Sequence, residues 1–98
     1  MAVTRRKIEN ILRKHKQELK KRFKLKKIGI FGSYVRDKQG KRSDVDILVE
    51  FKEPVSLLEF VAIERHLSEL IGKKVDLVMK SALKPRIGKH ILKEVMYI

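Results

Sequence analysis

Two aspartates, Asp44 and Asp46, stand two residues apart in a segment that is otherwise rich in valine, isoleucine and leucine. Side chains two apart on a strand emerge on the same face, so these carboxylates can hold a hard divalent cation together. Asp76 stands between apolar residues in a second strand-like segment. If the two strands are neighbours with these faces aligned, the three aspartates converge on one Mg²⁺ site.

The alternative interpretation of these aspartates is structural. Aspartates often begin strands in solvent, and Asp44 can cap the loop that precedes it. The position of Asp46 argues against this alternative, because β-propensity disfavours aspartate inside a run of apolar and β-branched residues. An unfavourable residue at that position suggests that Asp46 has a functional role.

Gly32 and Ser33 follow a short apolar segment, where a strand is expected to end. Backbone amides at such a turn can point at a phosphate, glycine allows a close approach, and the serine hydroxyl adds a donor. Taken alone, Gly-Ser after a strand is a common turn. Beside a Mg²⁺ site, the same turn would complete a site for phosphoryl or nucleotidyl transfer. Tyr34, the next residue, can stack on a base or fill the core.

The elements that must position these residues follow from hydrophobic spacing and from capping residues. Thr4 as N-cap, followed by apolar residues at helical spacing, predicts a helix over 5–22. The further predictions are a strand over 25–31, a short helix over 34–39, a loop over 40–43, a strand over 44–51, a helix over 56–71 between a Ser56–Glu59 capping box and Gly72, a strand over 74–79, and a last helix beyond Pro85 that ends near Met96. This order predicts an α+β fold, an α/β-type sandwich in which helices pack on a small mixed sheet of three to four strands.

Composition excludes several classes of protein. The chain has 98 residues, three histidines and no cysteine, so disulfides, thiol catalysis and a structural zinc site are excluded, and any metal must be held by oxygen. No apolar run approaches the roughly 20 residues that a membrane-spanning helix needs, and no signal peptide is recognisable. We therefore expect a cytoplasmic protein with one domain over 1–98 and no contact with a membrane.

The excess positive charge lies entirely in the N-terminal part of the chain. Residues 1–42 hold 16 lysines and arginines against 3 acidic residues, whereas residues 43–98 hold 9 of each. A basic surface attracts polyanions such as nucleic acid, nucleoside triphosphates or an acidic protein face. The alternative is a solvated, lysine-rich helix of a heat-adapted protein. Composition leaves both interpretations open.

A family resemblance joins these separate motifs. Gly32-Ser33, Arg36 and the Ser-Asp-Val-Asp run over 43–46 resemble the GS…R…(S)DxD signature of the DNA polymerase beta superfamily of nucleotidyltransferases. With its short length and Asp76, the chain resembles the minimal nucleotidyltransferases, or MNT proteins, over nearly its whole length. The resemblance implies a polymerase-beta-like nucleotidyltransferase core.

The resemblance also implies roles for the three aspartates. Asp44, Asp46 and Asp76 would be the catalytic residues and would bind two Mg²⁺ ions. Asp76 would in addition lie near the acceptor hydroxyl as general base.

The nucleotide-binding residues implied by the resemblance are Gly32, Ser33, Arg36 and Ser43. The Gly32 backbone and Ser33 would hold the β- and γ-phosphates of ATP. Arg36 would be either a phosphate contact or a structural tie to the acidic site, and the tie is favoured. Asp37 departs from the pattern, because family members often carry glycine after this arginine. Its added negative charge is expected to weaken nucleotide affinity.

The resemblance finally implies a reaction and a partner. MNT proteins are commonly encoded beside HEPN-domain proteins, and the pair resembles a toxin–antitoxin module in which the MNT protein is the antitoxin. The implied reaction is the Mg²⁺-dependent transfer of AMP from ATP to a tyrosine hydroxyl of a HEPN toxin, with release of pyrophosphate. The alternative is a non-catalytic antitoxin or partner-binding protein that acts through the basic N-terminal part. Nucleic acid is a less favoured partner, and a homo-oligomer is left open.

Overall fold

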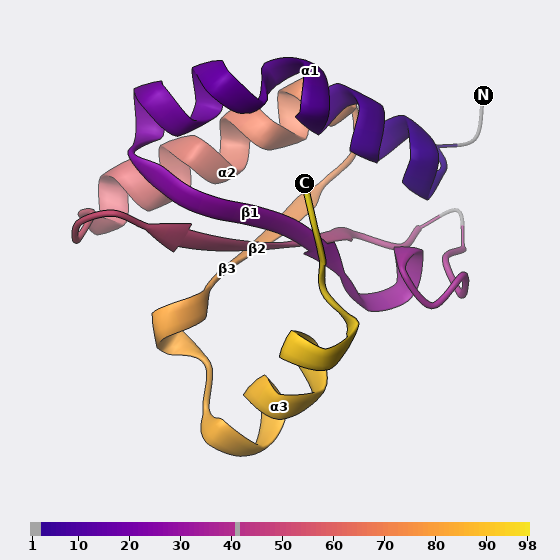
Figure 1. Ribbon diagram of the computed structural model, residues 1–98. Coiled ribbons are helices and arrows are strands. Elements are labelled where there is room, and N and C mark those ends of the chain that lie inside the picture. The colour runs from indigo at the N-terminus through magenta and orange to yellow at the C-terminus, as the bar shows by residue number, and fades with distance from the viewer. Residues whose placement is uncertain (1–2, 41) are drawn as a thin grey trace.

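The structure of the protein, a computed structural model, describes residues 3–40 and 42–98 (Figure 1). Over these residues the chain forms three α-helices, four strands and two short 3-10 turns at Gly32–Tyr34 and Lys80–Ala82. In chain order the helices and strands are α1 (Arg5–Phe23), β1 (Leu25–Phe31), β2 (Val45–Phe51), α2 (Leu57–Ile71), β3 (Val75–Met79), α3 (Pro85–Glu94) and β4 (Met96–Tyr97). Lys41, part of the loop predicted over 40–43, lies outside the described residues, as do Met1 and Ala2.

The strands form one mixed sheet in the order β3-β2-β1-β4. β1 is antiparallel to both of its neighbours, whereas β2 and β3 are parallel. Parallel neighbours need a crossover connection, and α2 lies within it. This arrangement confirms the predicted α+β class with helices packed on a small mixed sheet.

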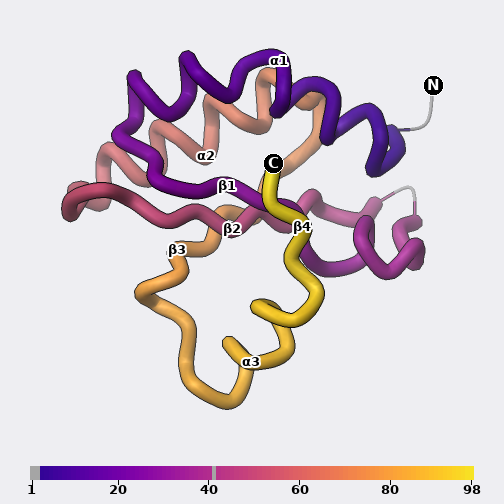
Figure 2. The backbone as a smooth tube through the Cα atoms, in the orientation of Figure 1, coloured from indigo at the N-terminus to yellow at the C-terminus, as the bar shows by residue number. Residues whose placement is uncertain are grey.

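The two long helices lie on one side of the sheet and α3 lies on the other (Figures 1 and 2). The core between the sheet and the long helices is made by apolar side chains that α1, α2 and alternate strand positions contribute. On β2 these positions are Val45, Ile47 and Val49, each of them fully buried. The predicted alternation of β2 is therefore confirmed, and its other face is turned toward the side of α3.

Capping residues that the sequence predicts mark the starts of both long helices and the end of α2. The Thr4 hydroxyl accepts from the Lys7 N–H at the start of α1, and the Ser56 hydroxyl accepts from the Glu59 N–H at the start of α2. Gly72 ends α2 with a φ of 77°, a left-handed conformation that glycine adopts readily. No helix in the described part of the chain is long and apolar enough to cross a membrane.

Two predicted elements differ from the structure. The last helix ends at Glu94 rather than near Met96, because Met96 and Tyr97 pair with Ile30 and Gly29 as a fourth strand. The short helix predicted over 34–39 is instead a 3-10 turn at Gly32–Tyr34 followed by further turns. Asp37 has a φ of 58°, which a continuing right-handed helix does not allow.

Candidate active site

The turn after β1 brings the predicted phosphate-binding residues against Asp46. Gly32 has a φ of 78°, in the region that favours glycine, and a Cβ at this position would overlap the Asp46 carboxylate. The N–H groups of Val35 and Arg36 both donate to the Gly32 carbonyl at 3.1 Å, which closes the turn. Glycine is therefore required here both by the backbone and by contact with the carboxylate.

The sheet register places Asp46 between this turn and Asp76. Asp46 is paired with Phe31 at the end of β1 on one side and with Asp76 of β3 on the other. Residues paired across parallel strands point to the same face of the sheet. The strand adjacency and face alignment that the sequence analysis required for Asp46 and Asp76 are therefore present.

The pKa of Asp46 is raised by its burial and by the neighbouring negative charges. Burial above all, and then the charges of Asp76 and Asp44, raise the pKa of Asp46 from its ordinary 3.8 to about 6. Arg36 opposes the shift and Glu94 adds to it by a smaller amount. A carboxylate that is costly to ionise beside like charges is the kind of group that a bound divalent cation stabilises.

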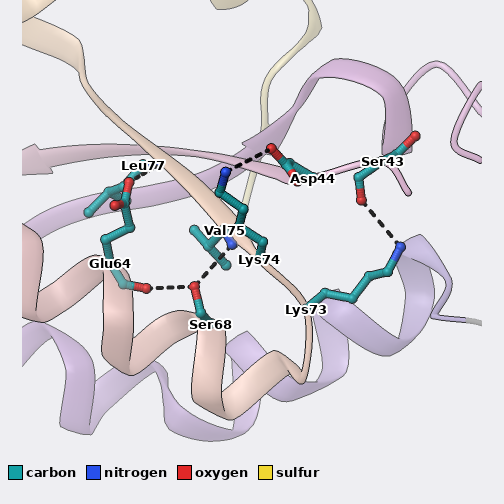
Figure 3. Close-up of polar contacts among 8 residues, drawn as sticks. All are labelled: Ser43, Asp44, Glu64, Ser68, Lys73, Lys74, Val75 and Leu77. Atoms are coloured by element: carbon teal, nitrogen blue, oxygen red, sulfur yellow. Dashed lines mark hydrogen bonds and ion pairs between the residues drawn. The ribbon is translucent and has the colours of Figure 1, made fainter. Parts of the chain in front are cut away.

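The three carboxylates do not form a ready-made metal cage. Among residues 3–40 and 42–98, no three side chains of His, Cys, Asp or Glu lie close enough together to hold a metal ion. Asp44 is directed to Lys74, with 3.9 Å between its Oδ2 and the Lys74 Nζ (Figure 3), and Asp76 is exposed. The donor chemistry still fits Mg²⁺, because carboxylate oxygens are the ligands that a hard cation takes.

Glu94 is a fourth acidic residue at this site, and sequence analysis missed it. Its Oε1 accepts from the Gly32 N–H at 3.3 Å and from Arg36 Nη1 at 3.4 Å. Arg36 is thereby tied to the acidic site. Glu94 is 62 residues distant from Gly32 in sequence, so no local spacing links the two residues. The available signal was its place in the last turn of α3, where the helix dipole disfavours a negative charge.

Lys73 is a second residue that sequence analysis missed, and it joins the two halves of the site. Its Nζ donates to the Tyr34 hydroxyl at 3.0 Å and to the Ser43 carbonyl at 3.2 Å, the latter seen in Figure 3. One contact holds the turn after β1 and the other holds the approach to β2. Tyr34 itself is 1% exposed, so of its two interpretations the structure supports core packing over base stacking.

Side chains of α2 hold the strand that carries Asp76 (Figure 3). The Val75 N–H donates to the Ser68 hydroxyl and the Leu77 N–H donates to the Glu64 carboxylate, both at 3.0 Å. β3 is an edge strand, and these two amides flank Asp76 on the side that has no neighbouring strand. The backbone on either side of Asp76 is therefore fixed by α2.

Of the remaining predicted site residues, Ser33 lies in the turn itself and Ser43 lies in the loop before β2. Ser33 is half-buried, and its carbonyl accepts from the Lys38 N–H at 2.9 Å. The Ser43 hydroxyl accepts from the Gly40 N–H at 2.8 Å, a contact within the loop. The contacts of Ser33 and Ser43 with a nucleotide therefore stay predictions. The left-handed backbone at Asp37 gives a conformational reason for the glycine that family members often have there.

Comparison with known proteins connects this arrangement to a family. The family model described as nucleotidyltransferase domain matches residues 12–98. The protein adenylyltransferase MntA of Thermococcus cleftensis is 53% identical over 96 residues, which cover 98% of this chain and 97% of the relative.

Solved structures share the fold. One assigned to the minimal nucleotidyltransferases has a TM-score of 0.75 at 30% identity and covers 91% of this chain and 93% of its own. Another is a complex of an MNT antitoxin with a tri-AMPylated HEPN toxin of Shewanella oneidensis. Its matched chain has a TM-score of 0.68 at 20% identity, with 92% of this chain and 70% of that chain covered, a likeness that extends to the fold alone. With the family model matching most of its length and the Gly32 turn set against Asp46 and Asp76, the chain belongs to the nucleotidyltransferase domain family, as a minimal nucleotidyltransferase related to MntA protein adenylyltransferases.

Proposed function

We propose that this minimal nucleotidyltransferase is a protein adenylyltransferase that transfers AMP from ATP to a tyrosine hydroxyl of a HEPN-domain toxin, and so acts as the antitoxin. ATP as the donor places the reaction in the cytoplasm. The observation that carries the proposal is the sheet register, which sets Asp46 between Asp76 and the Gly32 turn. Carboxylates beside a phosphate-binding turn are the combination that nucleotidyl transfer requires.

In this proposal, Asp44, Asp46 and Asp76 would hold two Mg²⁺ ions. Bound Mg²⁺ supplies Lewis acidity and neutralises charge on the triphosphate. The raised pKa of Asp46 supports the assignment, because burial and then the like charges of Asp76 and Asp44 disfavour its ionised form, which a bound cation would stabilise. The Gly32 turn and Ser33 orient the β- and γ-phosphates, which leaves the α-phosphorus facing the acceptor.

The transfer itself exchanges one bond to phosphorus for another. The acceptor oxygen forms a bond to the α-phosphorus, the bond from that phosphorus to the bridging oxygen breaks, and pyrophosphate leaves. Asp76 takes the proton of the acceptor hydroxyl. It is suited to this role because it is exposed at the edge strand, where a protein acceptor can approach.

The relatives support the identity of the acceptor. A relative covering 98% of this chain is named a protein adenylyltransferase, and a protein with the same fold is held in complex with an AMPylated HEPN toxin. These relatives favour catalysis over the alternative of a non-catalytic protein that binds through its basic N-terminal part.

The test uses ATP labelled at either the α- or the γ-phosphate, together with Mg²⁺ and a purified HEPN-domain protein as acceptor. The α-label is expected on the acceptor and the γ-label in pyrophosphate. An acceptor whose tyrosines are replaced by phenylalanine should remain unlabelled. Asp46→Asn should lose activity. Glu53→Gln makes the same change of net charge two residues beyond the far end of β2, so it serves as the matched control and should keep activity. Transfer of the γ-label would indicate a kinase, and a HEPN acceptor that stays unlabelled would contradict the proposal.

A further inference from the structure

Glu94 occupies the hydrogen-bond donors that a nucleotide phosphate would use. A single oxygen, Oε1, accepts from both the Gly32 N–H and the Arg36 guanidinium, at 3.3 and 3.4 Å. A backbone amide beside a guanidinium is a typical partner set for a phosphate oxygen. The Glu94 carboxylate is thus an internal anion at the phosphate-binding turn.

Backbone pairing between β4 and β1 positions Glu94 at the Gly32 turn. Immediately after it, Met96 and Tyr97 pair with Ile30 and Gly29 of β1. The fit is close, because a Cβ on Gly29 would overlap the Val95 side chain. The Glu94 side chain is only 21% exposed, whereas that of its partner Arg36 is 59% exposed. Glu94 is therefore held in place at the site by the pairing of the residues that follow it with β1, the strand that ends just before Gly32.

The negative charge of Glu94 is electrostatically unfavourable at this position for two reasons. Glu94 lies in the last turn of α3, where the helix dipole disfavours an anion, and it adds to the negative charge that raises the pKa of Asp46. Contact with Gly32 and Arg36 compensates for this cost. An N–H that donates to Glu94 cannot at the same time donate to a phosphate, and the two anions repel each other.

We propose that Glu94 is an internal competitor of the nucleotide, so that a phosphate oxygen must displace it from the Gly32 N–H and from Arg36. The inference rests on the proposed function, because it takes ATP to be the ligand of this turn. Glu94 determines how tightly the nucleotide binds, and displacement releases Arg36 to pair with the phosphates. The opposite possibility is that Glu94 positions the turn for the nucleotide, in which case its removal would weaken binding.

Calorimetric titration of AMP-PNP with Mg²⁺ into the full chain separates these possibilities. Glu94→Gln keeps the size of the side chain and removes its charge, and we expect it to bind AMP-PNP roughly tenfold more tightly than the wild type. Glu53→Gln makes the same change of net charge in an exposed ion pair with Lys24, and should leave the affinity unchanged. Equal or weaker binding by Glu94→Gln would overturn the inference.

Two further measurements keep the test decisive. Glu94→Ala should tighten AMP-PNP binding at least as much as Glu94→Gln. Because alanine is a good helix former, Glu94→Ala can serve as the test variant if Glu94→Gln does not fold. In ¹⁵N-labelled protein, the Gly32 amide resonance should shift when Glu94 is replaced and again when AMP-PNP is added to the wild type. If the folded wild type and all variants fail to bind AMP-PNP, the proposed function is contradicted and the inference falls with it. If the wild type and all variants bind AMP-PNP equally well, only the inference about Glu94 is contradicted and the proposed function stands.

Discussion

On β2, Val45 and Ile47 point toward α1 and α2 and are fully buried, whereas Asp46 between them points to the opposite face, beside Asp76. The first face is filled with apolar side chains from two helices. The second gathers carboxylates and the turn at Gly32, and there the pKa of Asp46 rises to about 6. One face of β2 thus contributes to stability and the other to chemistry. Substitutions at neighbouring positions should therefore affect mainly the free energy of unfolding on the first face and mainly activity on the second.

The largest effect is expected for Asp46→Asn. Loss of the central carboxylate should lower AMP transfer by roughly a thousandfold, since a metal-binding ligand contributes several kcal/mol to the transition state. The free energy of unfolding should stay the same or rise, because the substitution removes a half-buried charge beside like charges. Initial rates and urea unfolding measure the two quantities. A variant that is both inactive and strongly destabilised would mean that Asp46 belongs to the core.

Ile47→Ala, one residue further along, is expected to behave in the reverse way. Removing this fully buried side chain should lower the free energy of unfolding by about 3 kcal/mol, through lost burial and the cavity left behind. AMP transfer per folded molecule should change little at a temperature where the variant is folded. Urea unfolding together with rates corrected for the folded fraction tests this. A specific loss of turnover would show that the two faces are coupled.

The pH dependence should also separate stability from activity. Because the pKa of Asp46 is raised above its unfolded value of 3.8 to about 6, the unfolded chain releases this proton first. Metal-free stability should therefore fall as pH rises from about 4 to 6, whereas AMP transfer at limiting Mg²⁺ should rise over the same range, because the ionised carboxylate is the form that binds the cation. The difference in unfolding free energy between wild type and Asp46→Asn isolates this group. A difference that is flat over this range would contradict the raised pKa.

The smallest expected effect is at Lys73, which connects the loops around the site. Lys73→Met removes the contacts to Tyr34 and Ser43 and should cost about 1 kcal/mol of stability, with a loss of turnover larger than the change in KM. Lys74→Met is the matched control, because Lys74 is 81% exposed and 3.9 Å from Asp44. It should change stability by less than about 0.5 kcal/mol. If both variants behave alike, Lys73 does not position the site.

The features that the sequence predicts correctly are those with a local signature. Alternation in 44–51 separates Ile47 from Asp46 within a few residues, and Thr4 and Ser56 mark the starts of the long helices through their own side chains. The faces of strands and the ends of helices follow from spacing and capping chemistry. Whether Asp46 and Asp76 would be neighbours depended on strand pairing, which spacing alone does not specify.

The features that were missed depend on contacts distant in sequence. Met96 and Tyr97 form a strand too short to show alternation, and they do so because the β1 edge at Gly29 accepts them. Glu94 reaches Gly32 only through that pairing. Asp37 looked like an added charge in the nucleotide path, but its positive φ shows that the position constrains the backbone as well.

The proposed function requires that the face with Asp46 and Asp76 binds a nucleotide together with Mg²⁺. The most direct measurement is the affinity for AMP-PNP with and without Mg²⁺, in the wild type and in Asp46→Asn. Mg²⁺ should strengthen binding by the wild type and have little effect on the variant. The same Mg²⁺ dependence in both proteins would place the cation elsewhere and contradict the proposed function.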